Sequence, residues 1–394
     1  MDRLTALLPT RWLRELAPLS VGGVRVARGE GVLVWDDEQR RYLDLASGWD
    51  APLGHAHPAL LAAITEQAGR LSGAHPGFEF DARDDLIEAL SLVVPEPLSH
   101  VSVATTSAAA RRRAVRCARL ATGRSRIVVA GVRLTDPMSE RVTYGELGAA
   151  ERAVDTRVAA VVVPAVDAAD VRVPVAGYLA ELALRCRRTG ALLVIDEERT
   201  ALCTGSTLAC TAAGVMPDIL TMGGGLAAGL PFGVMITRPE VARRMQSMPG
   251  ASGAGPVVCA AAAATLRIAA DPAFRSHIDV VAEHLLARLR SLRLVEIREV
   301  RGCGLLLAID LRHRAHATVM QLRERGVLVA SNRADGLRVR PPLTLEKRQA
   351  DAFVEALASA VLALRRRGSA SGSARDVELR GAAARRSGLR SRPE

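Results

Sequence analysis

Lysine is almost absent from this sequence. Its 394 residues include 53 basic ones, and Lys347 is the single lysine among them. A lysine side chain supplies the primary amine with which many enzymes bond to carbonyl groups. Any chemistry of that kind must use Lys347 or does not take place in this chain. Lys347 lies at the polar start of the last expected helix, where we predict a solvated side chain.

Aromatic residues and paired cysteines are scarce as well. Aromatics make up 3% of the chain, so stacking surfaces for single-stranded nucleic acid are poorly supplied. The six cysteines form no CxxC pair, which predicts neither a metal site nor a disulfide framework. The chain shows no signal-peptide pattern and no apolar run long enough to cross a membrane. We therefore expect a reducing, cytoplasmic location.

Positive charge is concentrated at the C-terminus. The formal net charge is +11, and the stretch from Arg365 to Glu394 has nine arginines against three acidic residues. This stretch is also rich in Gly, Ser and Ala, which bury little apolar surface and favour disorder. A solvated tail is the main interpretation. Binding of nucleic acid is the alternative, which salt-dependent binding lost on deleting the residues after Leu364 would support.

Short apolar runs alternate with helical patterns through the middle of the chain. A long helix over 256–270 then leads to a looser series of helices and short strands, ending in a helix over 347–364. The alternation predicts an α/β domain with a mostly parallel sheet, followed by a smaller α+β domain. Strands are predicted at 101–104, 127–130, 158–164, 191–195, 219–221 and 232–236, and helices at 107–120 and 175–188.

Several segments occur in the order of one family's motifs. They are GVLVWD (31–36), YLDL (42–45), LGHAHP (53–58), LLVIDE (192–197), PDILT with the following GLPFG (217–233), RGCGL (301–305) and RVRPPL (338–343). Together they resemble the class III aminotransferases, fold type I pyridoxal-phosphate enzymes such as acetylornithine and omega-aminotransferases. The resemblance covers about residues 20 to 365. It implies an N-terminal segment (1–50) packed on the small domain, a large α/β domain (51–270) and a small α+β domain (271–365). The composition of residues 366–394 predicts a disordered tail.

The resemblance implies a lysine that bonds to the aldehyde of pyridoxal phosphate and later moves a proton. The family's motif places this lysine directly before a Gly-Leu pair, and here the run from Asp218 to Leu226 reads DILTMGGGL. Gly224 therefore stands at the lysine position. Glycine can be neither nucleophile nor base, so we predict no catalytic residue and no covalent bond to the cofactor.

Four other residues match cofactor or substrate positions of the family. Thr106 and Ser107 match the turn that holds the cofactor phosphate, with a helix N-cap as the alternative. Asp196 matches the carboxylate that pairs with the pyridinium nitrogen, with a capping aspartate as the alternative. Arg338 matches the arginine that holds a substrate carboxylate through two hydrogen bonds, with a surface arginine as the alternative.

Two functional hypotheses follow from the missing amine. The main one is an aminotransferase-like protein without transaminase activity, which acts in binding, in regulation or as the non-catalytic subunit of a dimer. The alternative is an enzyme of the family that acts on an amino or keto acid, either with pyridoxal phosphate or by cofactor-independent chemistry. The expected partners are a second copy or an intact relative, with a small acidic metabolite as ligand and no membrane.

Overall fold

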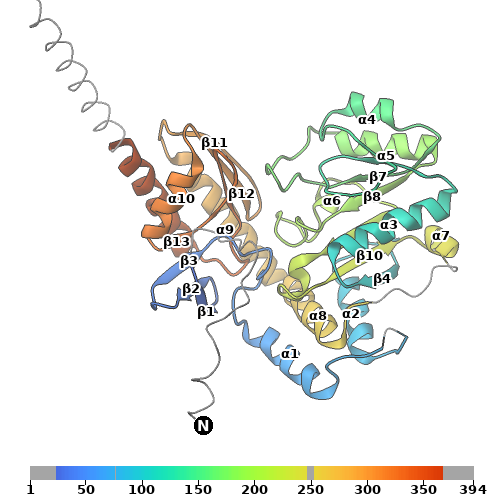
Figure 1. Ribbon diagram of the computed structural model, residues 1–394, viewed down its shortest axis with the longest axis horizontal. Helices are drawn as coiled ribbons and strands as arrows, with labels where there is room; N and C mark the ends of the chain where they lie inside the picture. The colour runs from blue at the N-terminus through green and yellow to red at the C-terminus, as the bar shows by residue number, and fades with distance from the viewer. Residues whose placement is uncertain (1–23, 76, 246–252, 367–394) are drawn as a thin grey trace, which may run out of the picture.

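The computed structural model describes residues 24–75, 77–245 and 253–366. Figure 1 shows two bodies, one built on a large sheet and the other formed by the C-terminal residues together with the first strands of the chain. The predicted disordered tail lies outside the described residues except for Arg366, as does the start of the N-terminal segment.

The large domain is built on a seven-stranded sheet. Neighbouring strands are parallel from β6 through β5, β7 and β8 to β9, whereas β10 is antiparallel to both β9 and β4. All six residues of β7 are buried, as expected for a central parallel strand. The strands, in spatial order, are β4 (His100–Ala104), β10 (Gly233–Thr237), β9 (Ile219–Gly223), β8 (Leu192–Asp196), β7 (Val158–Val163), β5 (Arg126–Val129) and β6 (Ser139–Arg141).

Helices cover both faces of this sheet. α3 (Ser107–Thr122) packs its buried residues on one face, against alternate strand residues such as Val129 and Val162. α5 (Tyr178–Thr189) belongs to the apolar cluster on the other face, with α4 (Leu147–Ala153) beside it. The two clusters use successive residues of the same strands, which point to opposite faces. The mostly parallel sheet predicted from the sequence is confirmed.

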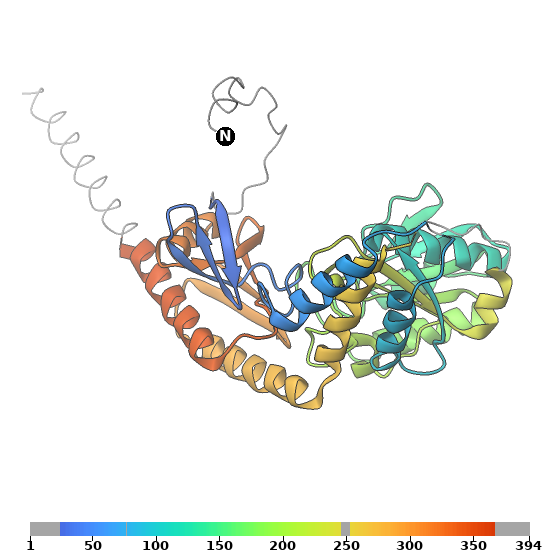
Figure 2. The ribbon, with the colours of Figure 1, turned by 90° about the horizontal axis from the view of Figure 1, so that it is seen from below.

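The C-terminal domain is a four-stranded antiparallel sheet with helices. The spatial order is β11 (Ile297–Cys303), β12 (Leu306–Leu311), β15 (Gly336–Val339) and β14 (Ala330–Arg333). α9 (Pro272–Ser291), α10 (Ala315–Glu324) and a helix over 347–366 accompany it. Figure 2 shows α9 beside the last helix, and both His284 and Arg288 bond to the Asp351 carboxylate at 2.9 Å.

The start of the described chain pairs with this domain. β1 (Val26–Glu30), β2 (Leu33–Asp36) and β3 (Arg41–Asp44) form an antiparallel meander, and β3 runs parallel to β13 (Val327–Leu328). The other elements are α1 (Pro58–Arg70), α2 (Asp81–Ser91), α6 (Ala209–Ala212), η2 (Gly224–Ala227), α7 (Pro239–Ala242), η3 (Arg243–Met245) and α8 (Pro256–Ala270).

α8 and α9 connect the two domains. Asp271 ends α8 and caps α9 by accepting a hydrogen bond from Phe274 N, and Pro272 begins the new helix. Among the described residues, no single helix is long and apolar enough to span a membrane. The α8–α9 pair meets that test only jointly and is bent by 72°.

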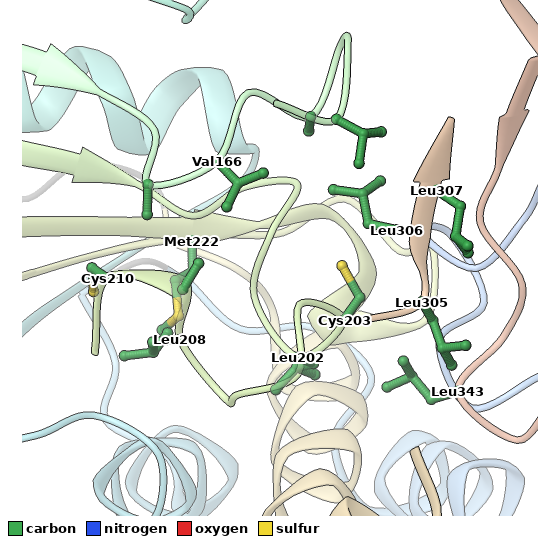
Figure 3. Packing of buried hydrophobic residues seen from close by; sticks show 14 of the residues in the cluster. Val166, Leu202, Cys203, Leu208, Cys210, Met222, Leu305, Leu306, Leu307 and Leu343 are labelled. Atoms are coloured by element: carbon green, nitrogen blue, oxygen red, sulfur yellow. The ribbon is translucent and has the colours of Figure 1, made fainter. Parts of the chain in front are cut away.

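Apolar side chains also join the domains next to the ends of β8 and β9. Figure 3 shows Leu202 and Cys203, from the loop after β8, close to Leu305 and Leu343 of the C-terminal domain. Leu305 N donates to Cys203 O at 2.8 Å. This contact holds the loop after β8 against the smaller domain, so residues of both domains meet at the carboxyl edge of the large sheet.

Candidate functional site

A cleft lies at the carboxyl ends of the parallel strands. Loops after β5, β7 and β8 surround a cavity of about 140 Å³, and Arg111 from α3 completes it. Open parallel sheets usually bind ligands at this edge, because the loops there converge and carry side chains that the sheet does not need for packing. The charged residues that line the cavity are Arg111, Arg133, Asp196, Glu198 and Arg199.

Asp196 ends β8 and is already paired within the protein. Thr221 Oγ1 donates to its Oδ1 at 2.8 Å, and Arg111 Nη1 donates to its Oδ2 at 3.2 Å. The same guanidinium nitrogen donates to Glu198 Oε2. Burial opposes the charge on Arg111, but the attraction of the two carboxylates outweighs it and raises the pKa of Arg111 above its ordinary value. Asp196, which the resemblance pairs with the pyridinium nitrogen of the cofactor, is therefore paired with the Arg111 guanidinium.

Thr106 and Ser107 lie at the start of α3. Thr106 is the N-cap, and its Oγ1 accepts a hydrogen bond from Ala109 N at 3.1 Å. Ser107 is 8% exposed in the first turn of the helix. Thr106 therefore has the capping role that the sequence left open as the alternative to phosphate binding. A phosphate role for either hydroxyl stays a prediction.

Gly224 begins η2, directly after β9, and packs against an indole ring. Its φ is +57°, in the left-handed region that favours glycine. A Cβ at this position would lie within 2.6 Å of three atoms of the Trp49 ring, Nε1, Cε2 and Cζ2. Trp49 is held there because its Nε1 donates to Glu198 O at 2.8 Å. The Arg199 guanidinium lies over the Trp49 ring, 4.9 Å from the ring centroid.

Lys347 does not belong to this cleft. It is exposed at the start of the last helix and is not among the residues that line the cavities near Gly224. The prediction of a solvated side chain is confirmed.

Arg338 lies on β15 and reaches the large domain. Its Nη2 donates to Ala169 O at 2.6 Å, and its Nε is buried without a hydrogen bond to any described residue. Burial, and then the charges of Arg340 and Arg199, lower the pKa of Arg338 to about 10. The side chain therefore keeps its charge at neutral pH. Substrate binding by Arg338 stays a prediction.

Sequence reasoning missed several residues that shape the cleft. Arg111 and Glu198 carry its buried ion pair, Trp49 occupies the space beside Gly224, and Arg340 lines the adjoining cavity. Signals for two of them were present. Arg111 follows Ser107 by four residues and so lies on the same helix face, and Arg340 follows Arg338 by two residues on an extended segment. No local signal pointed to Trp49.

Comparisons with known proteins decide the family. A model described as aminotransferase class-III matches residues 19–132 and 132–361, most of the chain. This chain belongs to the class III aminotransferase family. It is 34% identical over 383 residues to the acetylornithine aminotransferase of Mycobacterium tuberculosis, covering 90% of this chain and 96% of that protein. It is 30% identical over 383 residues to the LysW-aminoadipate semialdehyde transaminase of Deinococcus radiodurans, covering 88% and 89%.

A solved structure gives the same assignment. The Toxoplasma gondii ornithine aminotransferase, crystallised with partial occupancy of pyridoxal phosphate at its active site, superposes with a TM-score of 0.80. It is 26% identical and covers 87% of this chain and 90% of its own. The predicted fold type I α/β architecture is confirmed. Class III aminotransferases use pyridoxal phosphate. These matches favour the alternative hypothesis, an enzyme of this family, and contain no finding on loss of activity.

Proposed function

We propose that this member of the class III aminotransferase family binds a small anionic metabolite in the cleft and does not carry out transamination. The observation behind the proposal is the packing of Gly224 on Trp49 in a chain whose one lysine is exposed elsewhere. This proposal corresponds to the main hypothesis drawn from the sequence, an aminotransferase-like protein without transaminase activity. The comparisons support the family and leave this point to experiment.

The residues of the cleft do not fit a lysine-bound pyridoxal phosphate. Gly224, at the position that the resemblance assigns to the lysine, has no amine, and the Trp49 ring occupies the space a side chain there would need. Asp196, the expected partner of the cofactor nitrogen, instead accepts from Arg111. A second cation at this carboxylate would be repelled by the guanidinium. No step of a reaction is therefore assigned to the cofactor.

The charge of the cleft supports an anionic ligand. Arginines 111, 133, 199 and 340 line its two adjoining cavities, against the two carboxylates of Asp196 and Glu198. Arg111 contacts both carboxylates but can balance the charge of only one, so four arginines against two carboxylates leave this set with a formal charge of 4 − 2 = +2. Arginine binds carboxylates through two parallel hydrogen bonds, so a small carboxylic acid suits the site.

A second candidate is the activity of the relatives, aminotransfer between an amino acid or semialdehyde and a keto acid. Identity of 34% over nine-tenths of the chain favours it. It requires an amine in the cleft, so it predicts that pyridoxal phosphate bonds to this polypeptide. The two candidate functions therefore differ in whether a covalent adduct of pyridoxal phosphate with the polypeptide can be measured.

The decisive experiment uses the scarcity of amines. The chain offers one lysine amine in addition to its α-amino group, so Lys347→Arg removes the only side-chain site for an adduct. Wild-type protein and this variant are incubated with pyridoxal phosphate and reduced with borohydride, and the intact mass of each is then measured by mass spectrometry. We expect no stoichiometric adduct in either protein and no amino transfer from glutamate. One adduct per wild-type chain that is absent in the variant, together with turnover, would establish the second candidate.

The proposal extends to partners and location. We propose a dimer, formed by two copies or by this chain and an intact relative, in the cytoplasm. The six free cysteines support a reducing compartment. Co-purification of a lysine-containing relative would favour the heterodimer, and a single species in native mass spectrometry would favour two copies.

A further inference from the structure

Arg340 is a buried arginine with two unsatisfied donor nitrogens. The residue is 4% exposed, and its Nε and Nη2 make no hydrogen bond to any part of the chain that the structure describes. Asp50 and Glu198 are near enough to attract its charge, yet neither accepts from these two nitrogens. A buried charge without acceptors strongly disfavours folding, so such a group calls for a physical explanation.

The backbone holds Arg340 in this position. Its N–H donates to Leu45 O at 2.7 Å, and its carbonyl accepts from Gly48 N at 2.9 Å. Gly48 packs so closely that a Cβ there would lie within 2.7 Å of backbone atoms of Arg340 and Pro341. The segment after β15 is thus fixed between the N-terminal strands and the cleft, which fixes the backbone position from which the Arg340 side chain extends.

Arg340 lines a small cavity beside Gly224. This cavity is bounded also by Trp49, Glu198 and Arg199, and a water-sized group can place its centre anywhere within about 20 Å³ of it. Glu198 and Arg199 also line the cavity of about 140 Å³, so the two spaces adjoin. The smaller one can take the end of a ligand whose remainder lies in the larger one.

The two free donors of Arg340 determine which kind of ligand group the site can bind. Nε and Nη2 lie on one edge of the planar guanidinium, and their N–H groups point in the same direction. That edge matches the two oxygens of a carboxylate, which is planar and smaller than a tetrahedral phosphate. We propose that Arg340 forms an oxyanion subsite that binds one carboxylate of the ligand. This inference rests on the proposed function, because it names the group by which the anionic metabolite is held.

Calorimetric titration of the full-length protein with succinate tests this assignment. The variants are Arg340→Met, Arg340→Lys and, as a control, Arg290→Met, which removes an equal charge from the exposed end of α9. We expect wild type and the control to bind succinate alike. Arg340→Met should bind about tenfold to a hundredfold more weakly, and Arg340→Lys should be intermediate because it keeps the charge but loses the paired donors.

Thermal unfolding without ligand separates binding from stability. Removing an unpaired buried charge should leave the melting temperature of Arg340→Met equal to or above that of wild type. A lower melting temperature would show that the guanidinium is paired within the fold and would overturn the inference. Equal succinate affinity in wild type and Arg340→Met would overturn it while the proposed function stands.

Acetate and inorganic phosphate complete the titrations. Binding of phosphate, but not of succinate or acetate, that depends on Arg340 would overturn the carboxylate assignment. If wild type binds none of the three anions, the proposed function and this inference both fail. Weaker acetate binding in Arg340→Met than in the control would support the subsite directly, because acetate carries only the group that Arg340 is proposed to hold.

Discussion

The contact between Gly224 and Trp49 predicts how the protein responds to a single added methyl group. Gly224→Ala places a Cβ in the left-handed region, which costs about 1–2 kcal/mol for a residue other than glycine. It also forces that Cβ against the indole ring, and overpacking of this kind costs about 1–3 kcal/mol more. We therefore expect a loss of about 2–5 kcal/mol in the free energy of unfolding, measured by urea denaturation.

Gly123 provides a matched control for this measurement. Its φ is +68°, and a Cβ there would meet nothing within 4 Å, so Gly123→Ala should show the backbone cost alone, about 1–2 kcal/mol. In a Trp49→Ala background, Gly224→Ala should likewise fall to the backbone cost. Equal destabilisation by the two glycine substitutions in the wild-type background would refute the proposed contact. It would also mean that a side chain at position 224 has room to reach the cleft.

Two further substitutions test the site and the fold. Arg111→Met leaves the buried carboxylates of Asp196 and Glu198 without their partner. We expect it to lower the free energy of unfolding by about 3–5 kcal/mol. Adding Asp196→Asn in a double variant should restore part of this loss. The Arg119 guanidinium donates hydrogen bonds to Asp136 and holds the pKa of this carboxyl below its usual value. Asp136 therefore contributes to the free energy of unfolding above the unfolded carboxyl's pKa of about 4. This contribution is lost as the pH falls through the lower pKa of the folded state. Asp136→Asn should therefore cost about 1–3 kcal/mol at neutral pH and almost nothing in strong acid, and a cost independent of pH would contradict this reading.

Restoring the lysine alone should not restore activity. In Gly224→Lys the new side chain meets Trp49, and Arg111 still occupies Asp196. We expect no amino transfer from this variant and a lower melting temperature than that of wild type. Turnover at a rate above the uncatalysed reaction would show that the cleft still fits the cofactor.

Five strands of the large sheet, β5, β7, β8, β9 and β10, were predictable from the sequence because each is a run of mostly apolar, buried residues. Polar elements were not. β6 has no buried residue and pairs with β5, and β11 likewise has no buried residue and pairs with β12. α9 begins at Pro272 because Asp271 caps it directly after α8 ends. Such elements form because of contacts with a neighbouring strand or helix, and the local sequence pattern does not indicate these contacts.

The sequence by itself determined that the chain has one lysine, that glycine occupies position 224, and that apolar strands alternate with helices in an α/β order. These are properties of composition and local pattern. Only the tertiary structure decided that Arg111 reaches Asp196 across 85 residues of chain, that Trp49 packs on Gly224, and that Arg340 is buried with free donors. Each of these depends on where separate loops converge at one edge of a sheet, and that position is set by packing of the whole chain.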